Sequence, residues 1–251
     1  AYLKRHESLC HTYEGRNLKL IMHKTLIEQE LQKLIQEYSN HNLYDPIKYI
    51  LEIGGKRIRP VLVLQANEVF GGNKNEAIPL ALAVEVFHNF TLMHDDIMDK
   101  SDMRRGNPTV HKKWDVNSAI LSGDAMMIIA YSLINKLPLK YQAEVFSEFN
   151  KMSLLLCEGQ QDDMRFETET EVELSEYLEM IKNKTSVLIA FCLKAGAIVA
   201  GVDKKTQELI YDFGIKLGLA FELQDDYLDL YPKSEKRGKV IGGDILNKKK
   251  A

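Results

Sequence analysis

The sequence is poor in cysteine and in signals for export, and it has no large excess of one charge. Its three cysteines, Cys10, Cys157 and Cys192, are far apart and odd in number. They argue against a disulfide framework and favour reduced thiols in the cytoplasm. No secretory signal is visible. The formal net charge of −3 gives no reason to expect nucleic acid or a membrane surface as the main partner.

Apolar runs long enough for a membrane are also lacking. The longest, VLIAFCLKAGAIVAGV at 187–202, has 16 residues and is interrupted by Lys194. A membrane-spanning helix needs about 20 apolar residues. We therefore expect a buried helix here and no membrane span.

Turn and strand signals are scarce, whereas helical periodicity is strong. No proline occurs from 139 to 231, and neither Asn-Gly nor Asp-Gly is present. Apolar residues recur at steps of three and four in 20–38, 141–160 and 206–231. No internal repeat or linker divides the chain. The sequence predicts one all-α domain over 1–251. Because residue 1 is Ala and not Met, we expect the extreme N-terminus to be added or trimmed sequence, or disordered, and base no prediction on residues 1–16.

Two aspartate clusters share the spacing D-D-x-x-D. Asp95 and Asp99 are four residues apart, so on a helix they project from one face. Like charges at this spacing destabilise a helix by a few tenths of a kcal/mol, and Mg²⁺, which prefers carboxylate and phosphate oxygens, would compensate. Aspartates that are merely solvated at a helix end are the alternative. Asp225, Asp226 and Asp229 repeat the spacing, again after an apolar run. Two such helices facing each other across a cavity would suit a ligand with a diphosphate head and a hydrocarbon tail.

Five motifs occur in the order found in one enzyme family: GGKRIRP, HDDIMDKSDMRRG, GQQDD, KTS and FELQDDYLD. From about residue 50 onward the chain resembles the trans-isoprenyl diphosphate synthases (polyprenyl synthetases) of the short-chain geranylgeranyl and farnesyl type. The resemblance implies a bundle of about ten or more helices around a central cavity, a homodimer, and three Mg²⁺ ions per active site. It also implies the substrates, which are isopentenyl diphosphate and an allylic diphosphate with a dimethylallyl, geranyl or farnesyl chain.

The resemblance assigns roles to individual residues. The metal ligands it implies are Asp95, Asp96, Asp99, Asp225 and Asp229. Isopentenyl diphosphate would be bound by Lys56, Arg59, His88 and Arg105, and the allylic diphosphate by Arg104, Lys184, Thr185 and Lys239. The residues closest to the chemistry would be Asp95, Asp99, Asp225, Lys184 and Thr185.

Taken alone, several of these residues have simpler interpretations. The basic segment 54–60 also suits a solvated turn, although its lysine and arginine can donate charge-assisted hydrogen bonds to phosphate. A histidine such as His88 in an apolar stretch is usually a core residue. Lys184 and Thr185 precede an apolar run, so we expect a helix N-terminus there, which favours anions; Thr185 also suits an ordinary cap.

The chain departs from the family pattern at two places. Glu222 stands where the family commonly has Gln, and a carboxylate cannot donate a hydrogen bond unless it is protonated. Its role in substrate binding is therefore only weakly implied. The sequence ends at Ala251, whereas the family usually continues, so C-terminal helices of the family are expected to be missing from it.

Product length depends on what the growing chain meets along the helix that carries Asp95. The family pattern points to the fifth position before the cluster, Phe90, whereas an ideal helical wheel places Phe87 nearer to the Asp95 face. Thr91 is small and leaves room where farnesyl-specific enzymes tend to have an aromatic residue. We expect geranylgeranyl diphosphate (C20), with farnesyl diphosphate (C15) as the alternative. Both phenylalanines also suit a plain core.

Two rival functions follow from the same residues. A class I terpene cyclase ionises similar substrates but does not need the GGKRIRP site. A non-catalytic regulatory subunit of a heteromeric prenyltransferase would be expected to lose aspartates, and both clusters are intact.

Overall fold

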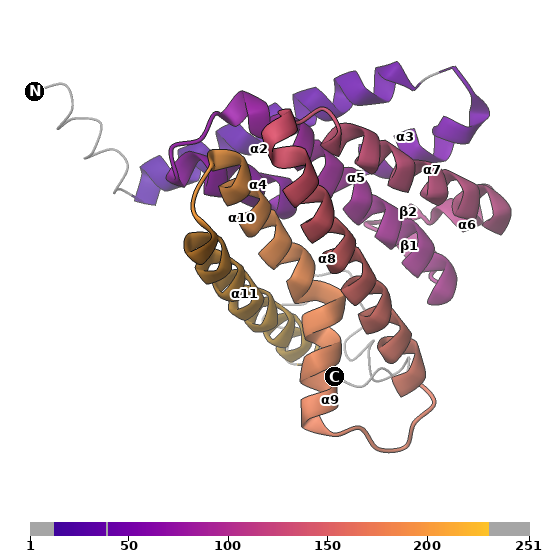
Figure 1. Ribbon diagram of the computed structural model, residues 1–251. Helices are drawn as coiled ribbons and strands as arrows, with labels where there is room; N and C mark the ends of the chain where they lie inside the picture. Colours follow the sequence, from indigo (N-terminus) through magenta and orange to yellow (C-terminus); the bar gives the residue numbers. More distant parts are fainter. Residues whose placement is uncertain (1–12, 39, 231–251) are drawn as a thin grey trace, which may run out of the picture. The chain divides into compact units, whose positions relative to one another are not determined.

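A computed structural model describes residues 13–38 and 40–230, with side chains described for 18–38 and 40–228. Lys239 and the side chain of Asp229, both predicted site residues, lie outside this part. The described part of the chain consists of helices, the loops that join them and one hairpin of two two-residue strands, which confirms the predicted all-α class (Figure 1). Nine of its α-helices have eight residues or more, slightly fewer than the predicted ten. The chain divides into two compact units, of which the first contains 1–68 and 73–138 and the second contains 69–72 and 139–251. The predicted single domain and its central cavity stay predictions.

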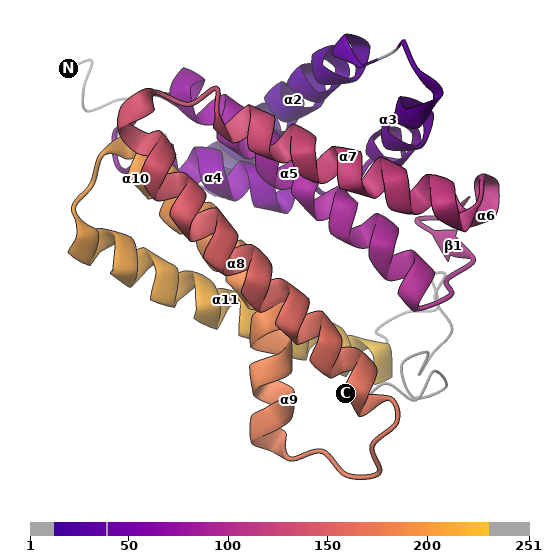
Figure 2. The ribbon, with the colours of Figure 1, turned by 45° about the vertical axis from the view of Figure 1, so that its right-hand side comes forward.

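The first unit is built on a long helix, α5. Its helices and strands are α2 (Tyr13–Glu37), η1 (Asn42–Tyr44), α3 (Asp45–Glu52), α4 (Ile58–Val69), α5 (Lys74–Met98), β1 (Met103–Arg104), β2 (Asn107–Pro108), α6 (Val110–Lys113) and α7 (Val116–Ile134). The side chains of Asn73 and Asp115 accept backbone hydrogen bonds at the starts of α5 and α7, which satisfies amides that have no partner within the helix. α5 and α7 pack side by side, as Figures 1 and 2 show, and Phe87 on α5 is buried.

The second unit surrounds an almost wholly apolar helix. It comprises α8 (Leu139–Phe166), α9 (Leu174–Ile181), the π-helical turn η2 (Lys182–Ser186), α10 (Val187–Ala200) and α11 (Lys204–Leu230). α10 contacts both α8 and α11 and is buried from Val187 to Val199. Its one charged residue, Lys194, donates hydrogen bonds to Glu148 and Glu208. These ion pairs explain how a lysine is accommodated in an apolar helix.

The apolar segment predicted at 187–202 belongs to a longer helix than expected, because α9, η2 and α10 run on without a break over Leu174–Ala200. By length and composition alone this run and Val116–Ile134 would each suffice to cross a membrane. The core helices of many folded proteins pass the same test, and the run Leu174–Ala200 is 83% buried within the protein. The expectation of no membrane span stays a prediction.

Candidate active site

The first aspartate cluster lies at the C-terminal end of α5. Asp99 caps the helix, and its amide donates to the carbonyl oxygen of Asp95 at 2.8 Å. Both side chains are partly exposed and one turn apart, so the predicted shared face is confirmed. The C-terminal end of a helix carries partial negative charge, so carboxylates there are destabilised unless a cation is close. This position favours metal binding by the pair.

Asp96 points away from that face. It is 2% exposed, and Arg104 Nε and Nη2 donate to its carboxylate at 2.8–3.0 Å. Asp96 thus holds the strand β1 against the end of α5. In this arrangement Asp96 and Arg104 neutralise each other, and their predicted binding of metal and of allylic diphosphate stays a prediction.

A tight hairpin positions the second arginine. Arg105 and Gly106 connect β1 to β2, and both have positive φ, at 52° and 77°, as two-residue hairpin turns require. The Arg105 guanidinium donates to the carbonyl oxygen of Gly54. It also lies against Gly55, where an added Cβ would be 2.9 Å from Arg105 Nη1. Glycine at 55 therefore lets two of the sequence motifs meet.

Arg59 and His88 are also brought together. Arg59 Nη1 donates to His88 Nε2 at 3.2 Å, so the imidazole proton is on Nδ1. Burial, and then the charges of Arg59, Arg105, Arg104 and Arg57, hold the pKa of His88 well below its usual value. His88 is neutral near pH 7 and orients Arg59 without adding charge. Its predicted place beside Arg59 and Arg105 is consistent with this geometry.

A basic cluster surrounds His88. It consists of Arg57, Arg59, Arg104 and Arg105, together with Lys56 of the same segment. Burial lowers the pKa of Arg105, and the charges of Arg57, Arg104 and Arg59 lower it further, against the opposite effect of Glu85. Crowded cations of this kind are stabilised by an anion of high charge. Lys56 is exposed at the edge of the same segment. The group offers charge-assisted donors that suit a diphosphate.

The KTS motif forms a π-helical turn in the second unit, so the predicted helix N-terminus is wrong. Lys184 and Thr185 lie inside η2, and their amides are not at the start of a helix. A Cβ on Gly159 of α8 would lie 2.3 Å from Lys184 N, so only glycine lets α8 approach this closely. Lys184 Nζ donates to Asp163 Oδ2 at 2.5 Å. π-Helical turns of this kind are frequent at functional sites.

The second aspartate cluster lies near η2 on α11. The Thr185 hydroxyl donates to the Glu222 carboxylate, which lowers the pKa of that carboxyl. Burial and the charges of Asp226 and Asp225 outweigh this effect and raise the pKa of Glu222. Asp225 is exposed, whereas Asp226 accepts a hydrogen bond from the Tyr177 hydroxyl. A protonated Glu222 can donate a hydrogen bond as Gln would.

The residues fit magnesium in their chemistry. In the part of the chain with described side chains, no three His, Cys, Asp or Glu side chains already form a metal site. The carboxylates of Asp95 and Asp99 lie at the C-terminal end of α5, where the partial negative charge of the helix favours a nearby cation. In the second cluster, the negative charges of Asp226 and Asp225 disfavour ionisation of Glu222. Hard oxygen donors of this kind are those that Mg²⁺ prefers.

Three aromatic rings line up along α5 before the aspartates. Phe90 is partly exposed, and its ring centroid is 5.6 Å from that of Phe87 and 4.8 Å from that of His94. Phe87 is 1% exposed. The Thr91 hydroxyl donates to the carbonyl oxygen of His88 at 2.8 Å. Phe90 is therefore the more accessible of the two proposed length gauges, and which of them limits product length stays a prediction.

The sequence did not predict the partners that hold these residues. Asp163 is within GQQDD, a motif that was recognised without any role for its members. Tyr177 and Glu85 belong to none of the recognised motifs, and the sequence suggested no role for Arg57, which lies between Lys56 and Arg59. The roles of these three residues are seen only in their tertiary contacts.

Comparisons with known proteins agree with the motifs. Residues 40–251 match the polyprenyl synthetase family. Geranylgeranyl diphosphate synthase of Methanosarcina mazei is 39% identical over 226 residues, covering 89% of this chain and 69% of that protein. Geranylfarnesyl diphosphate synthase of Natronomonas pharaonis is 35% identical, covering 90% and 72%. A crystal structure of a geranylgeranyl pyrophosphate synthase is 53% identical with a TM-score of 0.87, covering 90% of this chain and 69% of that one. The chain belongs to the polyprenyl synthetase family.

Proposed function

We propose that this prenyltransferase joins isopentenyl diphosphate to an allylic diphosphate, head to tail, and releases geranylgeranyl diphosphate. The observation that carries the proposal is the basic cluster around the neutral His88, which belongs to the same unit as Asp95 and Asp99. The arginines suit an anion, and the aspartates suit a cation. A diphosphate substrate used together with Mg²⁺ needs both.

The proposed roles of the residues are those that the family resemblance implies, and the positive charges of the lysines and arginines suit them to diphosphate. Lys56, Arg59 and Arg105 hold isopentenyl diphosphate, and Lys184 and Thr185 hold the allylic diphosphate. The aspartates Asp95, Asp99 and Asp225, with Asp96 and Asp229 as further candidates, would hold Mg²⁺, which when bound supplies positive charge toward the departing diphosphate.

In the reaction the allylic C–O bond breaks, and the isopentenyl double bond attacks the allylic carbon. The departing diphosphate takes the proton that restores the double bond. Lys184 stabilises charge as it develops on the leaving group, which is the electrostatic contribution expected of preorganised donors. No side chain has to act as a nucleophile.

The proposed product rests on the names of the relatives and on Phe90. Two of the relatives above are geranylgeranyl synthases, and one makes a longer chain. We propose C20, with C15 farnesyl diphosphate as the alternative. We also propose a cytoplasmic homodimer; sedimentation at micromolar concentration that showed only monomer would argue against the dimer.

One incubation separates the candidate functions. The purified protein is mixed with isopentenyl diphosphate, each allylic diphosphate in turn and Mg²⁺, and products are separated by chromatography, with EDTA as the control. A synthase consumes both substrates and yields a longer diphosphate. A terpene cyclase yields a hydrocarbon without isopentenyl diphosphate, and a regulatory subunit yields nothing.

A further inference from the structure

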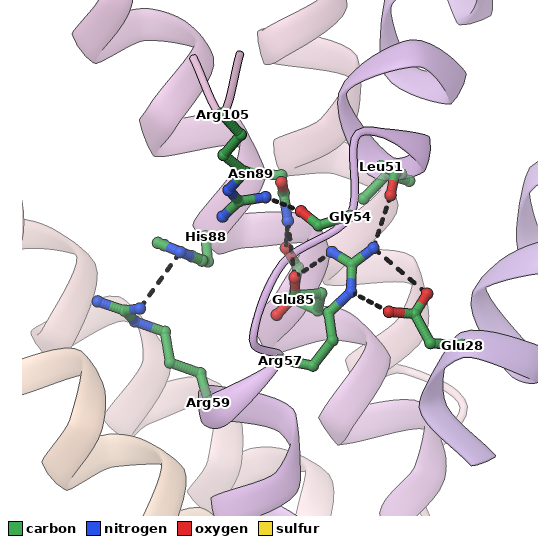
Figure 3. Close-up of polar contacts among 9 residues, drawn as sticks. All are labelled: Glu28, Leu51, Gly54, Arg57, Arg59, Glu85, His88, Asn89 and Arg105. Atoms are coloured by element: carbon green, nitrogen blue, oxygen red, sulfur yellow. Dashed lines mark hydrogen bonds and ion pairs between the residues drawn. The ribbon is translucent and has the colours of Figure 1, made fainter. Parts of the chain in front are cut away.

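Arg57 is a buried arginine between two proposed substrate ligands. It is 3% exposed. Its Nε donates to Glu28 Oε1 at 2.9 Å, its Nη1 to Glu85 Oε1 at 2.6 Å, and its Nη2 to the Leu51 carbonyl oxygen at 2.6 Å. Figure 3 shows the guanidinium enclosed by these partners, which belong to α2, α5 and α3. The side chain of Arg57, in the segment 54–57, thus contacts three helices.

The backbone at Arg57 explains why this contact matters for its neighbours. Its φ is +54°, in the left-handed region that residues other than glycine seldom adopt. The turn sends the Arg57 side chain inward, whereas Lys56 is exposed and Arg59 reaches His88 (Figure 3). A conformation of this kind persists only when surrounding contacts hold it. The buried ion pairs of Arg57 supply such contacts.

The same network extends to the hairpin arginine. Glu85 is 2% exposed, and its Oε1 also accepts a hydrogen bond from Asn89 Nδ2 at 3.0 Å. The negative charge of Glu85 favours the charged form of Arg105. Arg105 in turn donates to the carbonyl oxygen of Gly54, in the segment that Arg57 anchors. Because Glu85 pairs with the buried Arg57 guanidinium, this part of the network makes the structure around it rigid.

We infer that Arg57 is a positioning residue for the isopentenyl diphosphate site. Its contacts with Glu28 and Glu85 hold the segment 54–57 so that Lys56, Arg59 and Arg105 converge on one diphosphate. Because protein acceptors enclose the guanidinium, Arg57 acts through these neighbours and does not bind the substrate. The inference rests on the proposed function, since it takes those three residues as ligands of isopentenyl diphosphate.

A purely electrostatic role would make a different prediction at Glu85. Glu28, Arg57 and Glu85 together carry one net negative charge beside the basic cluster. Removing the Glu85 carboxylate makes the surroundings more positive, and charge alone would then strengthen diphosphate binding. If Arg57 positions the segment, the same change releases its anchor and weakens binding. The two roles therefore differ in the direction of the effect.

The test compares Glu85→Met, which removes the acceptor, with Glu85→Gln, which removes the charge but keeps an oxygen acceptor. KM is measured for each substrate with the other saturating, in the presence of Mg²⁺. We expect Glu85→Met and Arg57→Met to raise KM for isopentenyl diphosphate about tenfold while KM for the allylic diphosphate changes less than about twofold. Glu85→Gln should stay within about threefold of the wild type.

Lys194→Met is the matched control. Lys194 is 5% exposed and pairs with two carboxylates, Glu148 and Glu208, at 2.8 Å each, but in the other unit. It should lower the melting temperature as the Arg57 variants do and leave both KM values unchanged. If Arg57→Met does not fold, Arg57→Lys and the two Glu85 variants provide the same comparison.

Two outcomes tell the proposals apart. A wild type that consumes isopentenyl diphosphate, together with a folded Glu85→Met whose KM for it is unchanged or lower, overturns the positioning role alone. A wild type that does not consume isopentenyl diphosphate overturns the proposed function and this inference with it.

Discussion

Lys184 Nζ donates a hydrogen bond to Asp163 Oδ2 across the contact between η2 and α8. The pair is mostly buried, with the Asp163 side chain 10% exposed and that of Lys184 21% exposed. Asp163 thus holds a proposed substrate ligand at the π-helical turn, where Gly159 lets the two helices approach.

Asp163→Asn should therefore destabilise the protein. A hydrogen bond to a charged group contributes about 1.5–3 kcal/mol, and partial exposure of Lys184 places the expected loss near the lower end. Thermal unfolding should show a melting temperature about 3–6 °C lower. Asp162→Asn is the control, because Asp162 makes only an exposed ion pair with Arg165 and should shift the melting temperature by less than about 2 °C. Equal shifts in melting temperature would mean that the buried Asp163–Lys184 pair stabilises the protein no more than the exposed Asp162–Arg165 pair does.

Asp95→Ala should abolish most of the activity. Loss of one electrostatic element from such a site costs about 3 kcal/mol of transition-state stabilisation, or roughly a hundredfold in kcat/KM. Asp102→Ala is the control, because Asp102 is exposed and pairs with Lys112; it should remain active. Full turnover by Asp95→Ala, or by the wild type in EDTA, would exclude a metal role for this cluster.

The two substrate sites should respond separately. Lys56→Ala and Arg59→Ala should raise KM for isopentenyl diphosphate more than for the allylic substrate, because they belong to the basic cluster around His88. Lys184→Ala should do the reverse, and we predict the same for Lys239→Ala. Steady-state kinetics with each substrate varied in turn measures both values. Similar effects on the two substrates would show that the sites are assigned wrongly.

Glu222→Gln should stabilise the protein at high pH more than at low pH. The folded state raises the pKa of Glu222, chiefly through burial. A carboxyl with a raised folded pKa contributes its full stability below its unfolded pKa and loses it as the pH rises through the folded value. A glutamine side chain does not ionise, so its contribution to folding stability does not fall as the pH rises. In EDTA, the melting temperature of the variant should exceed that of the wild type at pH 8, and the difference should shrink toward pH 4; a gap that does not change with pH would contradict the raised pKa.

Periodicity was enough to predict the helices and the shared face of Asp95 and Asp99, because both depend only on residues three and four apart. The π-helical turn at Lys184 was not predictable in this way, since it depends on the close approach of Gly159 from another helix. The burial of Asp96 under Arg104 likewise depends on a hairpin that folds back onto the end of α5. Sequence patterns identify which residues can bind a diphosphate, whereas the side chains that orient them are fixed by packing between distant segments.

Phe90 should limit product length, and Phe87 should mainly support the core. Phe90 is partly exposed and lies between Phe87 and His94 along α5, closer to Asp95, so a growing chain that runs along this helix meets it first. Phe90→Ala should shift the product beyond C20 in chromatography. Phe87→Ala opens a fully buried site and should cost about 3–5 kcal/mol of stability, as should the control Phe149→Ala, whose ring packs on Phe191 in the other unit. Phe149→Ala should leave the product unchanged. If neither Phe90→Ala nor Phe87→Ala lengthens the product, the chain does not run along this face of α5.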